Sequence, residues 1–462
     1  MNETAHHHIR TLGVTDMTLF TVSAILLLDT LAASAAIGVS SISWWVILGV
    51  VFFVPYGLIS AELGTTYPEQ GGIYAWVRDA FGARWGTRVT WLYWLNNVLW
   101  QASICAIFSG ILAQMFFPGM SLGARLAVSI GLTWAIIGAT CMSLKIGKWV
   151  PNAGAIIKMI AFGVLIVAGV TYATGTGNKL ANDFSLANMM PAWGSSTQYI
   201  STIIYGMLGF ELMSSASAEM KNPTRDVPRS ILTSGIVIFL AYVLGTFAIL
   251  AAVPVDDIDL VEGLVDTFRQ LLGDSAAGKA GAMLLGTFVL FTFLSNAVTW
   301  SIGANRAAAQ AAIDGELPKL LAYEHPRVGT PVGAAVTMGA LTTLVLIAYG
   351  FVATSNEELF WSLFAASAVL FLLPYIGAVA AFMYARVHDA ERPRPYRVPG
   401  GRALAVTLTT VCISILGFSI VLFMYVPGDG FDWPVVIGSL ASIAIGEITI
   451  RWTEMKRRSS QA

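Results

Sequence analysis

The sequence predicts an all-α polytopic membrane protein with twelve transmembrane helices in a single membrane domain, residues 1–462. Of these 462 residues, 56% are hydrophobic and 11% are charged, whereas charged residues make up about 25% of an ordinary soluble domain. The apolar residues gather into runs of about 20, and a helix of that length crosses a hydrocarbon layer about 30 Å thick. The basic residues lie between these runs, mostly on one side. Together these three observations predict the fold class.

The twelve expected spans lie near residues 15–41, 45–66, 87–116, 123–144, 150–174, 196–220, 228–253, 277–312, 332–353, 358–384, 403–426 and 432–452. An even number of spans places both termini on the same side of the membrane. Most basic residues of the loops and tails lie on the same side as the N-terminus. The exceptions, on the opposite side, are Arg125, Lys179, Arg269 and Lys279. The positive-inside rule therefore predicts that both short tails are cytoplasmic. The expected location of this multi-pass protein is the plasma membrane of a bacterium.

Several classes of protein do not fit the sequence. The first apolar run is too long for a cleavable signal peptide, so we expect it to remain in the protein. Cys105, Cys141 and Cys412 lie in separate spans without a C-x-x-C pair, and no cluster of metal ligands is visible. We find neither a paired nucleophile and base nor a phosphate-binding loop. We therefore expect no enzyme activity, no cofactor, no metal and no nucleic-acid partner.

The first span carries an acid at its centre. Asp29 lies in the middle of the run from Ala24 to Gly38, and small residues follow it. A carboxylate at this depth costs about 2.5–3.5 kcal/mol on insertion scales, so it indicates a functional site. We predict that Asp29, Thr30, Ala33 and Ser34 bind substrate where the helix is broken. The alternative is an acid that is neutralised by a proton or by a neighbouring lysine and only fixes helix packing.

The sixth span has the same character as the first. It contains Tyr205, Gly206, Gly209, Phe210 and Glu211, so two glycines and an acid lie at mid-membrane. Corresponding interruptions five helices apart indicate an inverted-repeat transporter whose substrate lies between two discontinuous helices. The carboxylates suit an ammonium group, and the half-helix N-termini suit a carboxylate. The two aromatic side chains either close over the substrate or pack in the core.

Four segments resemble the amino acid–polyamine–organocation permeases. They are residues 205–211 with 219–229, residues 62–77, residues 303–306 with 314–318, and residues 394–401. They occur in the same order as in that family and extend over nearly the whole chain. The region from Ala24 to Ala36 is most similar to the glutamate/GABA antiporter branch.

The resemblance implies the leucine-transporter fold and transport by alternating access. Five helices of repeat one, about 15–174, would be followed by five of repeat two, about 196–384, and by two extra helices at about 403–452. The family's Gly-Ser-Gly type turn is replaced here at Asp29, which makes a decarboxylated or basic amine a more plausible substrate than an α-amino acid. Lys158 matches a fifth-span lysine that takes the place of a sodium ion in some members. It is therefore a candidate coupling residue, and the alternative is a structural tether to carbonyls of the first span.

Four further positions complete the candidate site. Asn97 and Trp300 lie within the third and eighth spans, where they either line a substrate cavity or pack between helices. Glu219 lies near Lys221 and Arg225 at the cytoplasmic end of the sixth span, which predicts an inner gate or a solvated charged cluster. Tyr375 follows Pro374 in the tenth span and is a second gate candidate.

These observations predict a secondary active transporter of amino acids or related small amines, with exchange favoured by the resemblance. The expected partners are the substrate, protons and the lipid bilayer, and the expected assembly is a monomer or a homodimer. Two alternatives remain open at this point. One is a proton-coupled uptake symporter of amino acids or polyamines, and the other is a membrane sensor that has kept the fold without transport.

Overall fold

The computed structural model describes residues 13–67, 72–142, 149–175, 179–211, 222–327 and 329–459. Within these ranges, ten helices are long and apolar enough to cross a membrane, which confirms the polytopic all-α class. Nine are α6 (Ala83–Phe116), α7 (Leu122–Cys141), α9 (Trp149–Thr174), α13 (Pro223–Ala252), α15 (Ala276–Ile313), α16 (Val332–Gly350), α17 (Asn356–His388), α18 (Gly401–Met424) and α19 (Trp433–Ser459). The tenth is formed by α3 (Ser40–Leu48), the π-helical turn η1 (Gly49–Phe53) and α4 (Val54–Thr66).

Two of the expected spans are broken helices. In the first, α1 (Val14–Ile25) ends before Asp29, and α2 (Leu31–Ala35) begins after it. In the sixth, α11 (Ile200–Gly206) ends at Gly206, and residues 207–210 are not helical. Residues 212–221 lie outside the described part of the chain. An Asp at mid-membrane and paired glycines therefore mark breaks in the helices, as the sequence indicates.

Shorter elements connect the long helices. They are α5 (Ile73–Phe81), α10 (Leu186–Met189), α14 (Gly263–Leu272), the 3-10 turns η2 (Ser195–Tyr199), η4 (Val255–Asp257) and η5 (Lys319–Ala322), and the antiparallel strands β1 (Tyr425–Val426) and β2 (Gly430–Phe431). The sequence analysis placed no helix at α5 or α14, because both are too short and too polar to cross a membrane. It also began the second span at residue 45, whereas α3 begins at Ser40. Gly38, with a φ of 93°, makes the early turn between α2 and α3.

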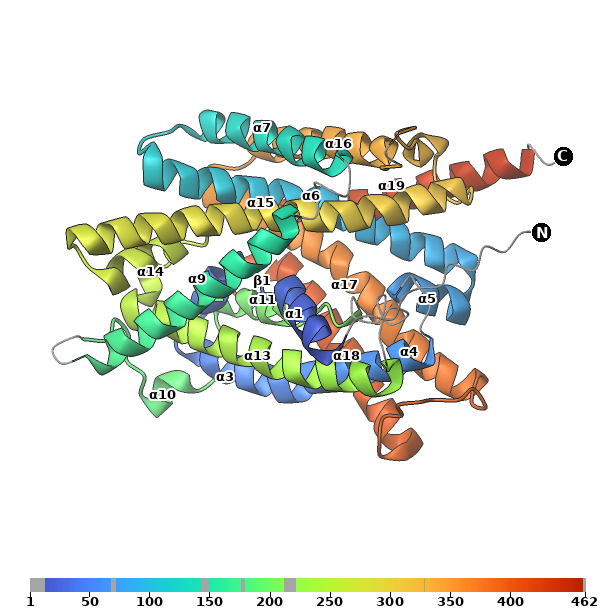
Figure 1. Ribbon diagram of the computed structural model, residues 1–462, viewed down its shortest axis with the longest axis horizontal. Helices are drawn as coiled ribbons and strands as arrows, with labels where there is room; N and C mark the ends of the chain where they lie inside the picture. Colours follow the sequence, from blue (N-terminus) through green and yellow to red (C-terminus); the bar gives the residue numbers. More distant parts are fainter. Residues whose placement is uncertain are drawn as a thin grey trace.

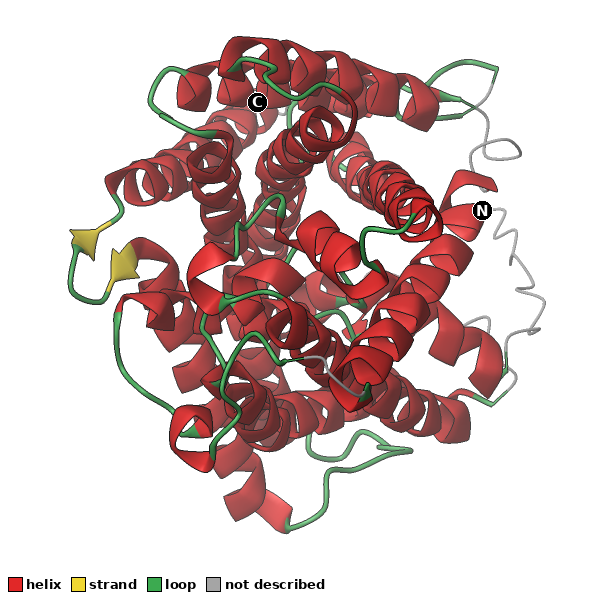
Figure 2. Cartoon of the chain, turned by 90° about the vertical axis from the view of Figure 1, so that its left-hand side faces the viewer, coloured by secondary structure: helices red, strands yellow, loops and turns green. Residues whose placement is uncertain are grey.

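The centre of the bundle is formed by α6 and α17. In the most apolar segment of α6, 83% of the residues are buried inside the protein, and in that of α17, 78%. The corresponding fractions are only 22% for α7 and 28% for α19. Figure 1 shows most long helices running along the long axis of the molecule, with α6 and α17 crossing its interior. Figure 2 looks along that axis and shows the β-hairpin at the edge. Residues on α6 and α17 can therefore line a site inside the bundle.

Charged side chains mark the two ends of the bundle differently. At one end of the bundle α4, α17 and α19 finish, and α6 and α18 begin. We call this end, which lies on the right in Figure 1, the basic end. At the other end, half-buried acids pack α14 onto the bundle. Gln114 donates to Asp266 Oδ1 at 2.7 Å, and Arg125 pairs with Glu262 at 3.4 Å. These contacts join α14 and the turn before it to α6 and α7.

The acids at α14 predict a pH dependence of stability. Burial raises the pKa of Glu262 and Asp266, and the negative charge of Asp259 raises both further. A pKa that is higher in the folded state contributes stability at low pH, and this contribution is lost as pH rises through the raised pKa. We expect the thermal midpoint of the wild type to exceed that of a Glu262→Gln, Asp266→Asn variant by more at pH 5 than at pH 7.5. A difference between the two proteins that is the same at both pH values would contradict this assignment.

Candidate functional site

The first break presents Asp29 to the interior of the bundle. The side chain is only 1% exposed, and the indole Nε1 of Trp100 on α6 donates to its Oδ2 at 3.2 Å. Among the described residues, Oδ1 has no hydrogen-bond partner. A buried carboxylate oxygen without a donor is costly, so it is suited to accept a hydrogen bond from a cationic ligand.

Tyr242 on α13 holds the backbone of the first break. Its hydroxyl accepts from the N–H of Leu27 at 2.9 Å and donates to the carbonyl of Ile25 at 2.8 Å. Its ring stacks on Trp45 with centroids 4.5 Å apart and planes inclined by 12°. An interrupted helix leaves backbone groups unpaired, and in a membrane they need a partner within the protein. The sequence analysis missed this residue, although a tyrosine in the middle of an apolar span was the available signal.

Tyr242→Phe tests this role. Removing the hydroxyl leaves the buried N–H of Leu27 unpaired, and such a group costs about 1–3 kcal/mol. We therefore expect a lower thermal midpoint of the purified protein and weaker substrate binding, since the break loses its fixed geometry. The exposed Tyr323→Phe is the matched control and should change neither quantity. Equal behaviour of the two variants would show that Tyr242 does not hold the break.

Lys158 on α9 contacts the end of α1 rather than Asp29. Its Nζ donates to the carbonyl of Ser23 at 2.7 Å and to Oδ1 of Asn296 on α15 at 2.9 Å, and the side chain is 1% exposed. The ammonium therefore joins three helices at the start of the first break. This contact is the tether weighed as an alternative in the sequence analysis, and a coupling role stays a prediction.

The second break touches the first. Gly206 ends α11 beside the ring of Tyr242, and Gly209 follows with a φ of +128°, which an L side chain rarely adopts. A Cβ on Gly209 would lie 2.7 Å from Cγ1 of Ile25, the last residue of α1. Glycine is thus required here for two reasons, and the two breaks are in direct contact.

Glu211 lies at the end of the second break and is 4% exposed. Tyr375 of α17 donates to its Oε1 at 2.6 Å, and Tyr56 of α4 donates to its Oε2 at 3.1 Å. Unlike Asp29, Glu211 therefore has a hydrogen-bond donor on each oxygen. Tyr375, which the sequence suggests as a gate residue, thus binds the same carboxylate as Tyr56. Tyr56 was not predicted from the sequence.

Aromatic rings connect the two acids. We name six residues the aromatic wall: Tyr93, Trp100, Tyr205, Trp300, Phe371 and Tyr375. From Trp100, which bonds Asp29, the centroids are 6.2 Å to Trp300 and then 6.1 Å to Phe371. Phe371 is 4.9 Å from Tyr375, which bonds Glu211, and Tyr205 packs on Phe371 at 5.2 Å. Aromatic faces attract cations, so this wall is compatible with a cationic ligand between the acids.

The remaining predicted residues divide into two groups. Thr30 and Ala33 are buried at the first break, and Thr30 Oγ1 has no partner within the described residues. Ser34 donates to Leu31 O at 2.8 Å. Asn97 bonds the Tyr93 carbonyl of its own helix at 2.9 Å, and Phe210 stacks on Phe53 at 4.8 Å. Asn97 thus contacts the aromatic wall only through the backbone of Tyr93, and the ring contacts described for Phe210 are with Phe53 and Tyr56, outside the wall.

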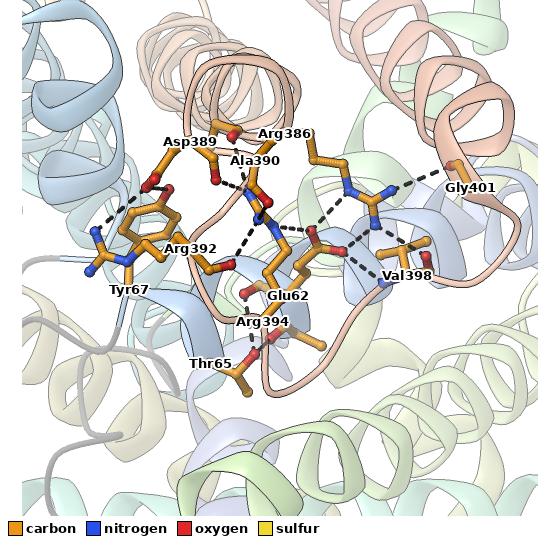
Figure 3. Close-up of polar contacts among 12 residues, drawn as sticks. Glu62, Thr65, Tyr67, Arg386, Asp389, Ala390, Arg392, Arg394, Val398 and Gly401 are labelled. Atoms are coloured by element: carbon orange, nitrogen blue, oxygen red, sulfur yellow. Dashed lines mark hydrogen bonds and ion pairs between the residues drawn. The ribbon is translucent and has the colours of Figure 1, made fainter.

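Glu219, the other predicted gate residue, lies outside the described residues. At the basic end, the structure instead shows a buried ion-pair cluster around Glu62 of α4 (Figure 3). Arg386 of α17 donates to both carboxylate oxygens, Arg394 pairs at 3.2 Å, and the N–H of Val398 donates at 2.7 Å. The side chains of Glu62, Arg386 and Arg394 are 3%, 6% and 8% exposed. This cluster ties the end of α4 to α17 and to the segment before α18.

The sequence did not predict this cluster. Glu62 and Arg394 belong to two separate motifs, and an acid within the second span was the signal that could have singled Glu62 out. Figure 3 also shows Tyr67, whose hydroxyl donates to Asp389 at 2.8 Å, with the guanidinium of Arg392 4.2 Å above its ring. A second polar link thus joins α4 to the end of α17.

A membrane helix bundle with two touching breaks, each carrying a buried acid, defines the protein as a membrane transport protein of the discontinuous-helix class. The chain belongs to the amino acid permease family, whose model matches residues 12–445. Its relatives are permeases and antiporters, so the chain is a transporter and not an enzyme.

Three relatives illustrate the family. The probable agmatine/putrescine antiporter AguD of Lactococcus lactis subsp. lactis (strain IL1403) is 34% identical over 436 residues, covering 93% of this chain and 92% of the relative. The polyamine transporter PUT1 of Oryza sativa subsp. japonica is 26% identical, with 89% and 72% covered. The glutamate/gamma-aminobutyrate antiporter of the same Lactococcus strain is 23% identical, with 77% and 72% covered. The resemblance to this family is thereby confirmed.

Proposed function

We propose that the protein exchanges small linear amines, above all diamines, across the plasma membrane. The observation that carries this proposal is the pair of buried carboxylates, one on each break, connected by the aromatic wall. A linear diamine has a cation at each end and methylene groups between them. In this proposal its two cations pair with Asp29 and Glu211, and its methylene groups lie against the rings. The 34% identical relative, a probable agmatine/putrescine antiporter, supports the same substrate class.

The two acids would act differently. Asp29 has one unpartnered oxygen and would receive the first ammonium group directly. Glu211 has a tyrosine hydroxyl on each oxygen, so a second cation must compete with Tyr56 and Tyr375. These tyrosines belong to α4 and α17, and their displacement would transmit binding to both helices. Tyr375 would thereby work as a gate.

Lys158 would keep the first break in place during this cycle. Its ammonium group is a covalent part of the protein and binds the carbonyl of Ser23 near the end of α1. It would thus take the place of a dissociable cation. This supports a cycle driven by exchanged solute. A role in proton coupling remains part of the proposal, because the same ammonium faces a region that contains Asp29.

We further propose twelve membrane crossings in two inverted five-helix repeats plus two extra helices, with both termini in the cytoplasm. Ten membrane-length helices and two broken spans support the count, and the basic end supports the orientation. Alternating access would then move the broken spans against the rest of the bundle. Nothing in this scheme requires more than one copy of the chain.

Counterflow in proteoliposomes tests the function. Vesicles preloaded with putrescine, agmatine, butylamine, γ-aminobutyrate or glutamate would be given external labelled putrescine. We expect rapid uptake only with internal putrescine or agmatine, because butylamine lacks the second cation and the other two carry a carboxylate. Accumulation in empty vesicles under an imposed pH gradient would instead favour the proton-coupled symporter. Exchange restricted to zwitterionic amino acids would overturn the diamine proposal.

A further inference from the structure

We propose that a groove between α5, α6, α17 and α19 binds one anionic glycerophospholipid, with its acyl chain in the groove and its phosphate at the basic end. The groove has a volume of about 560 Å³ and lies on a different side of α17 from the residues that bond Glu211. Its wall includes Phe81, Trp85, Pro374, Ala380 and Ile450, and only Arg88 and Glu447 among its lining residues are charged. It therefore suits a hydrocarbon chain and not a polar solute.

The chemistry of the groove changes toward the basic end. Arg88 lies there with its guanidinium 4.9 Å from the ring of Trp85, and it pairs with Glu447 of α19. Trp85 is 54% exposed, as expected for an aromatic side chain at a membrane interface. An amphipathic ligand in this groove would thus have its polar group beside Arg88.

Positive charge exceeds negative charge around this mouth. The nearby ends of α6 and α19 carry Arg84, Arg88, Arg451, Lys456, Arg457 and Arg458 against Glu447 and Glu454. The paired arginines Arg84, Arg458 and Arg451 there have side chains that are 63%, 70% and 76% exposed. Because an arginine fork matches phosphate geometry, this excess selects an anionic headgroup over a zwitterionic one.

A buried polar atom lies in the wall of this groove, packed against Gly446 of α19. Trp91, which lines it, is 6% exposed, and its indole Nε1 has no hydrogen-bond partner among the residues that the structure describes. Trp91 lies one helical turn beyond Arg88 on α6, in the direction away from the mouth. An ester carbonyl, which follows the phosphate in a glycerophospholipid, would supply the missing acceptor.

The test is native mass spectrometry of the purified full chain with added phosphatidylglycerol or phosphatidylcholine. We expect one retained phosphatidylglycerol per chain and little retained phosphatidylcholine. Arg84→Gln with Arg451→Gln should weaken retention at least tenfold, since each basic residue near a membrane surface contributes about fivefold. Ala380→Trp, which fills the groove without changing charge, should abolish retention. Phosphatidylglycerol should also raise the thermal midpoint of the wild type but not of Ala380→Trp.

Matched controls separate this site from general lipid contact. Arg225→Gln with Arg229→Gln removes two exposed arginines at the start of α13, and Val167→Trp adds a ring to an exposed position of α9. Both controls should retain the lipid as the wild type does. Equal loss in controls and groove variants, or equal retention of the two lipids, would overturn the proposal. A dimer that forms without lipid and is broken by Ala380→Trp would also overturn it, because a second chain would then occupy the groove.

Discussion

Asp29→Asn is expected to abolish exchange of cationic amines. The substitution keeps the size of the side chain and still offers Trp100 an acceptor, but it removes the charge from a side chain that is 1% exposed. Truncating one partner of a buried ion pair costs about 3–5 kcal/mol. This corresponds to a loss of amine affinity of about a hundredfold or more. Equilibrium binding of labelled putrescine and the initial rate of counterflow would both measure it.

Asp16→Asn is the matched control for this prediction. Asp16 lies on α1, in the same broken span as Asp29, and its exposed carboxylate accepts only the N–H of Gly13 in the described contacts. We expect its transport rate to stay near that of the wild type. Undiminished putrescine binding by Asp29→Asn, with the protein folded, would remove Asp29 from the substrate site and leave it a role in helix packing.

Glu62→Gln is expected to cause the largest loss of stability in the chain. The carboxylate of Glu62 neutralises Arg386 and Arg394, which are almost as buried as Glu62 itself. An amide of the same shape leaves two buried guanidinium groups without a counter-charge. Breaking a buried pair in this way costs about 3–5 kcal/mol. The expected result is a large drop in the thermal midpoint measured in detergent, and in the free energy of unfolding measured with denaturant.

An exposed ion pair at the same end of the bundle provides the comparison. Glu454 accepts from Arg84 at 2.6 Å, but the arginine side chain is 63% exposed. Because solvent screens such pairs, Glu454→Gln should change the thermal midpoint little. If the two variants lose similar stability, the cluster around Glu62 does not hold α4 and α17 together as its contacts suggest.

Hydropathy and charge were sufficient to predict the membrane class and most of the long helices, because a helix in lipid must be long and apolar. Asp29 also marked the first break, since an acid is unusual at that depth. Gly206 and Gly209 marked the second break because they accompany another mid-membrane acid, Glu211. The pairing of distant side chains was not predictable. Tyr242 satisfies a backbone that is 215 residues away in the sequence, and only the packing of α13 against α1 brings them together.

The site shows the same division between local and distant information. The acids at 29 and 211 were identified from their own spans, whereas the tyrosine at 56 resembles any aromatic residue of an apolar helix. Its role depends on a hydrogen bond between α4 and the second break. For Asn97 the sequence left two roles open, because an amide inside a membrane can bond its own helix, as it does here, or face a cavity. A substrate-binding role for Asn97 stays a prediction.

The contact between Gly209 and Ile25 limits how solutes can escape through the protein. There is no room for even a methyl group between the two breaks, so neither can move toward the other without displacing it. Ile25 and Gly209 therefore close the space between the two breaks. A solute or ion can pass between them only if α1 and the second break first move apart, which suppresses leakage in this conformation.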